Sequence, residues 1–213
     1  TRSSSSLTSK QIIKNIIKVT TCPRSGLPRG GVACVDRKAD RRQPGRGHRT
    51  DRSGNRLSFS DKLKEVSDFS NIFFICVGTP PRGSGEANLL ALYKSIFSIS
   101  ENTKDAFFII KSTVPPGTCE ELSAMIDSSK NINISMCPEF LREGTAVKDF
   151  LKPDRIVIGK NPDISDDFFL TIFSPFIREN KSIIFMDTLS AELTKYASNS
   201  FLATKISFMN ELS

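Results

Sequence analysis

No apolar run in this sequence is long enough to span a bilayer, and the N-terminus lacks the apolar core and cleavage site of a secretory signal. These absences favour a soluble, cytoplasmic protein without a membrane partner. The chain also lacks an initiating methionine, which suggests a piece of a longer protein. Its 213 residues suffice for one sizeable core and the beginning of a second domain.

Paired cysteines are also missing. The five cysteines are odd in number and show no CxxC spacing, so the sequence offers neither a disulfide framework nor a set of zinc ligands. Two of them, Cys34 and Cys76, lie within apolar runs typical of strands. We therefore expect reduced, buried thiols and no metal site.

Acidic residues are scarce in the first third. Residues 1–65 hold 16 Lys and Arg against five Asp and Glu, whereas residues 66–213 hold 14 against 18, so the net charge of +7 arises from one part of the chain. The most basic stretch, residues 37–56, is rich in Arg and Gly and almost free of large apolar side chains. A fused or misread coding segment would explain this composition. A solvated loop or a nucleic-acid-binding arm is the alternative, and the absence of stacking aromatics weakens the arm.

From residue 69 onward, short β-branched or aromatic runs alternate with segments of helical period. Strands are predicted at 72–77, 107–112, 132–136, 155–159 and 182–186, and further upstream at 12–20 and 32–35. Helices are predicted at about 87–101, 118–129 (with the Thr118 hydroxyl as its cap), 139–150 and 164–176, and from Ser190. Strands that are apolar on both faces and alternate with helices indicate a parallel sheet covered on both sides. The sequence therefore predicts a doubly wound, Rossmann-like α/β domain.

Small polar or rigid residues follow three of the predicted strands, at 78–81, 112–116 and 137–139. In a doubly wound sheet, ligands bind beyond the carboxyl ends of the strands, where loops lead into helices. For any one of these loops, the simpler explanation is that its Pro and Gly residues only terminate the strand. Three such loops at one edge favour a binding site.

Four stretches carry a closer resemblance: FICVGTPPRGSGEANL (74–89), IIKSTVPPGT (109–118), CPEFLREGTAVKDFLKPDRIVIG (137–159) and SAELTKYASNSFLATKISFMNE (190–211). In this order they resemble the UDP-glucose 6-dehydrogenase family, from about residue 57 to the end. The resemblance implies an NAD-binding domain over 57–189 and the start of an all-α central dimerisation domain over 190–213. The full-length protein would form a homodimer through that last helix, and residues 1–56 would be an atypical first part.

The resemblance implies a double oxidation, in which the C6 alcohol of UDP-glucose becomes the carboxylate of UDP-glucuronate while two NAD molecules each take a hydride. Glu139 is then the candidate that holds and deprotonates a water. Glu143, one helical turn on, would be its partner on the cofactor side. Lys195 and Asn199 would offer a cation and an amide to the reacting oxygen, and Thr113 would share the water and approach the nicotinamide.

Further residues match the binding surfaces of the family. The cofactor side is predicted to contain Asp36, Val77, Gly78 and Thr79, and the sugar nucleotide is predicted to lie against Phe140, Leu141 and Arg142. Each assignment has a simpler alternative: Glu139 and Glu143 as acids at a helix N-terminus, Lys195 and Asn199 as a solvated face, and Phe140 with Leu141 as core.

The sequence departs from the pattern of this family at two places. A dinucleotide site needs a G-x-G-x-x-G turn leading into a helix, but the segment TCPRSGLPRGG between the first two predicted strands has neither that spacing nor room for a helix. The nucleophilic cysteine of the family sits in a Gly-rich motif, and none of the five cysteines has that context. We therefore expect the chain to be inactive alone. The alternatives are a non-catalytic nucleotide-binding or assembly module and another UDP-sugar 6-dehydrogenase.

Overall fold

The computed structural model describes residues 16–20, 32–36, 57–60, 67–68, 70–142, 144–176 and 183–213. Its strands are β1 (Ile16–Thr20), β2 (Val32–Asp36), β3 (Leu57–Ser60), β4 (Ile72–Ile75), β5 (Asp105–Ile110), β6 (Asn131–Met136), β7 (Ile156–Gly159) and β8 (Ile183–Met186). Its helices of six or more residues are α3 (Leu90–Asn102), α4 (Thr118–Met125), α5 (Ala146–Leu151), α6 (Asp166–Phe173) and α7 (Thr188–Glu211). Hydrogen bonds join the strands into one sheet in the order β3-β2-β1-β4-β5-β6-β7-β8.

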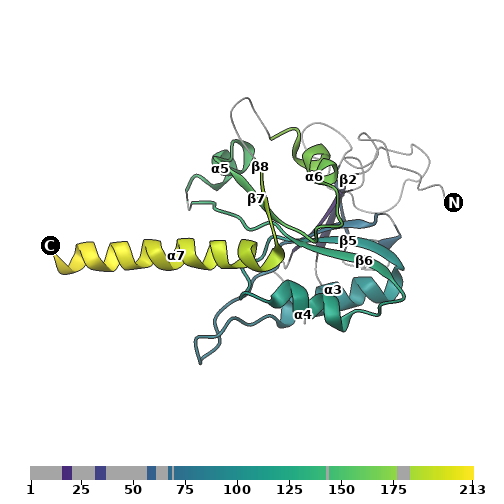
Figure 1. The fold of residues 1–213 in the computed structure, drawn as a ribbon, viewed down its shortest axis with the longest axis horizontal. Coiled ribbons are helices and arrows are strands. Elements are labelled where there is room, and N and C mark those ends of the chain that lie inside the picture. Colours follow the sequence, from purple (N-terminus) through teal and green to yellow (C-terminus); the bar gives the residue numbers. More distant parts are fainter. Residues whose placement is uncertain are drawn as a thin grey trace.

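Helices cover both faces of this sheet (Figure 1), with α3 and α4 on one side and α5 and α6 on the other. The doubly wound α/β fold predicted from the sequence is therefore confirmed. Helix α7 begins against the sheet and then projects away from the body of the domain. Among the described residues, no helix combines the length and the apolarity that crossing a membrane requires.

Two apolar clusters form the core because successive residues of a strand point to opposite faces. In β4, Phe73 packs with Leu92 of α3 and Leu122 of α4 in one cluster. Its neighbour Ile72 belongs to the other cluster, together with Phe169 of α6. The central strands are thus buried on both sides, as the continuous apolar runs of the sequence predicted.

The sheet is not parallel throughout, which corrects one expectation. Strands β1, β4, β5 and β6 pair in parallel, as do β7 and β8. In contrast, β1 pairs antiparallel with β2, β2 with β3, and β6 with β7. Only residues 21–31 separate β1 from β2, and a parallel crossover needs a dozen residues or more, usually with a helix.

The helix predicted at 139–150 is wrong in its first half. Residues 137–142 are not helical, and α5 begins only at Ala146. Gly144 has φ 82°, in the left-handed region that side chains with a Cβ avoid, so it interrupts the helical period read from the sequence. Glu139 therefore does not lie in the first turn of a helix. The other elements predicted downstream of residue 69 are confirmed with shifted ends.

Several predictions fall on residues that the structure does not describe. They concern Glu143, the segment between β1 and β2, and the basic stretch 37–56. Asp36 ends β2, of which the backbone alone is described. Of the cysteines whose side chains the structure describes, Cys119 and Cys137 are buried and Cys76 is half-buried.

Candidate functional site

The loops that follow β4 and β5 lie side by side at one rim of the sheet, since these two strands are parallel neighbours. The Thr79 hydroxyl donates a hydrogen bond to the carbonyl oxygen of Thr113 at 2.8 Å. The Ser112 hydroxyl donates to the carbonyl oxygen of Val77 at 2.7 Å. The structure thus brings together the predicted cofactor-side residues Val77, Gly78, Thr79 and Thr113.

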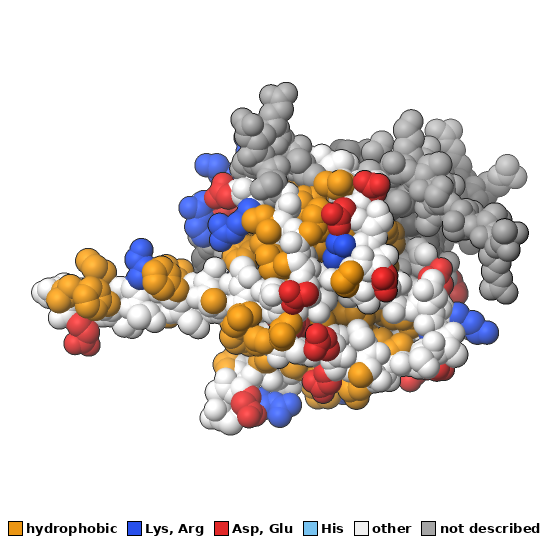
Figure 2. All heavy atoms as spheres, in the orientation of Figure 1, with side chains coloured by type: hydrophobic (Ala, Val, Ile, Leu, Met, Phe, Trp, Pro, Cys, Tyr) orange, Lys and Arg blue, Asp and Glu red, His pale blue; other side chains and the backbone are white. Residues whose placement is uncertain are grey.

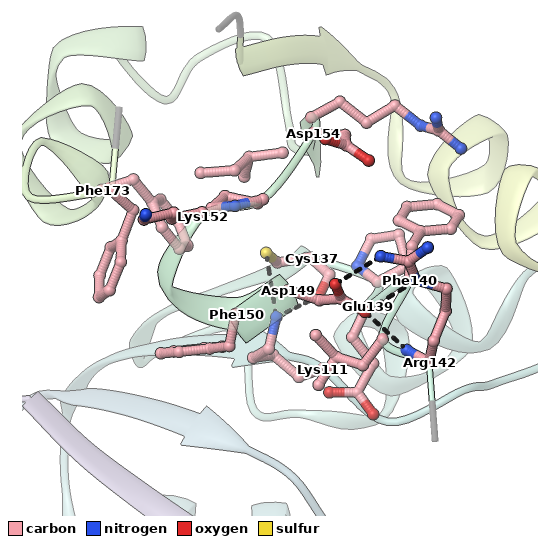
Figure 3. Close-up of a pocket in the computed structure, with 16 residues that line it drawn as sticks. Lys111, Cys137, Glu139, Phe140, Arg142, Asp149, Phe150, Lys152, Asp154 and Phe173 are labelled. Carbon is pink, nitrogen blue, oxygen red and sulfur yellow. Dashed lines mark hydrogen bonds and ion pairs between the residues drawn. The ribbon is translucent and has the colours of Figure 1, made fainter. Parts of the chain in front are cut away.

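A cavity of about 250 Å³ lies next to this rim. Its walls come from the end of β5, the segment 137–142 and the segment 149–156, with two phenylalanines of the α6 region (Figure 3). The predicted substrate residues Glu139, Phe140, Leu141 and Arg142 all line it. The sequence placed these residues at one site, and the structure places them in one cavity wall.

Phe140 connects the cavity to helix α7. The Nζ atom of Lys195 lies 5.3 Å from the centre of the Phe140 ring, and the guanidinium carbon of Arg155 lies 4.8 Å from it. Both distances are within the range of cation–π attraction. Lys195, from a segment more than 50 residues away, therefore reaches the same wall as Glu139.

Partial burial lowers the pKa of Lys195, and the positive charge of Lys111 lowers it further, while the carboxylate of Glu139 raises it. The charges of Glu139 and Lys195 thus act on each other across the site. The Glu139 side chain is exposed, so its carboxylate can reach a ligand or a water. Asn199 lies one helical turn beyond Lys195 and is exposed.

Lys111 is a site residue that the sequence analysis missed. Its Nζ atom donates to the carbonyl oxygen of Cys137 at 3.3 Å and lies 3.7 Å from the Cys137 sulfur (Figure 3). The contact holds the segment that carries Glu139 to the end of β5. A lysine directly after an apolar strand, two residues before Thr113, was the signal that could have identified it.

Cys137 itself is a buried thiol. Burial raises its pKa, and the nearby charge of Lys111 opposes that rise only in part. A thiol must ionise to act as a nucleophile. Cys137 is therefore a packing residue at the base of the cavity.

Arg142 is engaged by Asp149 in the structure (Figure 3). Its Nε and terminal nitrogen donate to the two carboxylate oxygens at 3.1 and 2.8 Å, and its backbone N–H donates at 3.1 Å. The Thr145 hydroxyl donates to the same carboxylate at 2.9 Å. Asp149 thus fixes the turn that joins the cavity wall to α5, and contact between Arg142 and a sugar nucleotide stays a prediction.

These hydrogen bonds, led by that of the Arg142 side chain, hold the pKa of Asp149 well below its ordinary value. A depressed carboxyl pKa stabilises the fold above the unfolded pKa of about 4, and the stabilisation is lost as pH falls through the lower folded value. We expect Asp149→Asn to lower the free energy of unfolding at pH 7, and the deficit relative to the wild type to shrink in acid. Urea unfolding between pH 2.5 and 7 measures this. The exposed Asp163→Asn is the control, and a deficit that does not vary with pH contradicts the assignment.

Two family models match the chain. Residues 47–177 match the NAD-binding domain of the UDP-glucose/GDP-mannose dehydrogenase family, and residues 189–213 match the central domain of the same family. The first match covers more than half of the chain. The boundary between the two matches lies close to the start of α7.

Similar proteins carry related names. The UDP-glucose 6-dehydrogenase of Rickettsia felis is 46% identical over 160 residues, which are 74% of this chain and 36% of that protein. A solved UDP-glucose dehydrogenase from Pyrobaculum islandicum has a TM-score of 0.66 at 39% identity and covers 74% of this chain and 38% of its own. A GDP-mannose dehydrogenase from Pseudomonas aeruginosa has a TM-score of 0.65 at 29% identity, with 71% and 37% covered. The chain thus spans little more than a third of the length of these relatives.

Proposed function

Because the chain belongs to the UDP-glucose/GDP-mannose dehydrogenase family, we propose that it forms part of an enzyme that oxidises UDP-glucose to UDP-glucuronate with NAD. The observation that carries the proposal is the meeting of Glu139 and Lys195 at Phe140, beside the rim of the parallel strands. Relatives at 44 to 46% identity are named UDP-glucose 6-dehydrogenase, which favours this sugar over other UDP-sugars.

The described residues fit NAD along one edge. Gly78 is exposed, and a Cβ built on it would meet no atom within 4 Å, so the backbone at the rim is open to a flat ring. The hydrogen bond between Thr79 and Thr113 holds that rim in place. When bound, NAD supplies the hydride acceptor.

The region of β1 and β2 is less suited to binding the pyrophosphate of NAD. The family's nucleotide fold places a crossover helix between two parallel strands, and the N-terminus of that helix holds the pyrophosphate. The antiparallel pairing of β1 and β2 supports a weakened pyrophosphate site. Asp36 at the end of β2 is proposed to face the ribose.

The catalytic roles proposed for this chain follow from the resemblance to the family, and the exposure of Glu139 and the partial burial of Lys195 support them. The exposed carboxylate of Glu139 accepts a proton from a water held at the cavity mouth. Lys195 and Asn199 donate hydrogen bonds to the reacting oxygen, and partial desolvation of the Lys195 amine eases proton exchange. Thr113 orients the same water. Glu143 is proposed as their partner on the cofactor side.

The aldehyde-to-acid step has no covalent route among the described cysteines. Burial raises the pKa values of both Cys119 and Cys137, and the Glu192 carboxylate raises that of Cys119 further. Cys76 directly follows β4 and is half-buried, with the core residue Val77 next to it. Since none of the five cysteines has the sequence context of the family's nucleophile, we propose that these 213 residues bind ligands but do not complete the reaction.

Incubation of the chain with UDP-glucose and NAD is expected to produce no rise in absorbance at the NADH band, with the Rickettsia felis relative as the active control. NMR should nevertheless show NAD shifting the amide signals of Gly78, Thr79 and Thr113. Ser129, in the loop before β6, is the control signal. Sustained NADH formation contradicts the inactive state, and unchanged rim amides at millimolar NAD contradict the proposed cofactor edge.

We also propose that α7 pairs with the same helix of a second copy. Figure 2 shows hydrophobic side chains along the part of α7 that projects from the domain. Leu202, Ile206 and Met209 are each more than half exposed and share a face, since they are spaced by four and three residues. The match of residues 189–213 to the family's central domain supports the same role.

A further inference from the structure

A fully buried carboxylate joins helix α7 to helix α4. Glu192, on the first turns of α7, is 0% exposed. Its Oε2 accepts a hydrogen bond from the backbone N–H of Gly117 at 2.6 Å, and its Oε1 accepts one from that of Cys119 at 2.8 Å. The two contacts link segments that are more than 70 residues apart in the sequence.

Glu192 takes the place that the sequence analysis gave to Thr118. The Thr118 hydroxyl donates to the carbonyl oxygen of Pro115 at 2.7 Å, and the cap residue of α4 is Gly117, with φ 95°. A helix N-terminus presents unpaired N–H groups and a positive dipole end, which together compensate a buried anion. Without those donors, burial of the carboxylate would be strongly unfavourable.

The start of α7 is also fixed from the side of the sheet. Ala191 is fully buried against Gly159 at the end of β7. A Cβ added at Gly159 would lie only 2.5 Å from the Cβ of Ala191. The first turns of α7 therefore have one position, set by Gly159 on one side and by the N-terminus of α4 on the other.

The two segments that Glu192 joins both carry residues of the proposed site. Lys195 follows Glu192 by three residues, which is less than one helical turn. On the other side, Gly117 follows Thr113 by four residues, in the loop that the Thr79 hydroxyl holds. A single carboxylate thus sets the distance between the helix that carries Lys195 and the loop that carries Thr113.

We propose that Glu192 is a positioning residue of the catalytic site: its carboxylate, bound to the amides of Gly117 and Cys119, holds the first turns of α7 so that Lys195 stays over Phe140 beside Glu139. Its relevance to catalysis rests on the proposed function. The placement of Lys195 by Glu192 is a property of the free chain and is tested without any ligand.

The test compares Glu192→Gln with the wild type by NMR of the lysine side chains. Glutamine keeps the shape of glutamate but loses its charge and one acceptor oxygen, so α7 is expected to move away from α4. The titration of Lys195 should then shift upward toward that of an ordinary lysine, because the amine becomes hydrated. The amide protons of Gly117 and Cys119 should shift upfield as their bonds to the anion weaken.

Two further variants distinguish the positioning of Lys195 from a general effect on the stability of the fold. Gly159→Ala displaces the start of α7 from the opposite side and should shift the Lys195 titration in the same direction, with Glu192 unchanged. Glu211→Gln removes a carboxylate from the exposed end of the same helix and should change neither signal.

A lower unfolding temperature of Glu192→Gln with an unchanged Lys195 titration would show a structural role alone and overturn the proposal. Should Glu192→Gln fail to fold, the Lys195 titration is measured in Gly159→Ala and in the charge-retaining Glu192→Asp instead. An unchanged titration in both variants would likewise overturn the proposal. Failure of the proposed function has a different signature, since the rim amides would then not respond to NAD while the Lys195 shift would persist.

Discussion

Replacing Leu92 by alanine is expected to lower the free energy of unfolding by about 2–5 kcal/mol. Leu92 is 0% exposed and joins α3 to Phe73 of β4 in the larger apolar cluster. Truncation removes buried methyl groups and leaves a cavity that the rigid sheet cannot close. Since a domain of this size is stable by only about 5–15 kcal/mol, the loss is a large fraction of the total.

Leu90 provides the matched control for this experiment. It lies on the same helix but is 56% exposed, so Leu90→Ala should change the free energy of unfolding by no more than about 0.5 kcal/mol. Both variants make the same chemical change in the first turn of α3, so burial is the main difference between them. Urea unfolding followed by circular dichroism measures both, and equal losses would show that α3 is not packed on the sheet as described.

The second large effect concerns the oligomeric state. In sedimentation velocity, the chain is expected to form dimers whose fraction rises with concentration, because the exposed apolar side chains of α7 leave water when two copies meet. Ile206→Glu places a charge in the middle of that face. Burial of one such side chain contributes about 1.5–3 kcal/mol, and the substitution removes one from each of the two copies, so the dimer should weaken by about 100-fold or more.

Ser207→Glu is the control for the dimer experiment. It adds the same charge to the same helix, but residue 207 lies outside that face, and its neighbours on the helix at positions 204, 210 and 211 are polar. Its effect on dimer formation should therefore be small. A clean monomer of the unaltered chain at every concentration would contradict the pairing of α7, as would equal weakening by both substitutions.

Local sequence patterns predicted most of the described fold because those patterns directly reflect burial. The run around Ile72 and Phe73 is apolar at consecutive positions, and both residues are buried, one on each face of β4. Similarity to the family supplied the order of the motifs. The helix at 139–150 was wrong because its apolar spacing is compatible with a helix, whereas the left-handed backbone of Gly144 is not.

For β1 and β2, the direction of strand pairing followed from the length of the connection. The sequence analysis saw that no helix fits between the first two strands, but still expected a parallel sheet. The antiparallel pairing of β1 and β2 is the physical consequence of that short connection. A closer reading of the eleven intervening residues, 21–31, would have predicted it.

The sequence by itself determined the α/β class, the family and the rim loops that carry Thr113 and Glu139, since all of these follow from local runs and motifs. Only the tertiary structure decided that Lys111 holds Cys137, that Lys195 lies over Phe140, and that Glu192 binds the N-terminus of α4. In the sequence, a lysine or glutamate on a helix is most simply a solvated charge. Its actual partner comes from a distant segment, and only the packed fold brings the two together.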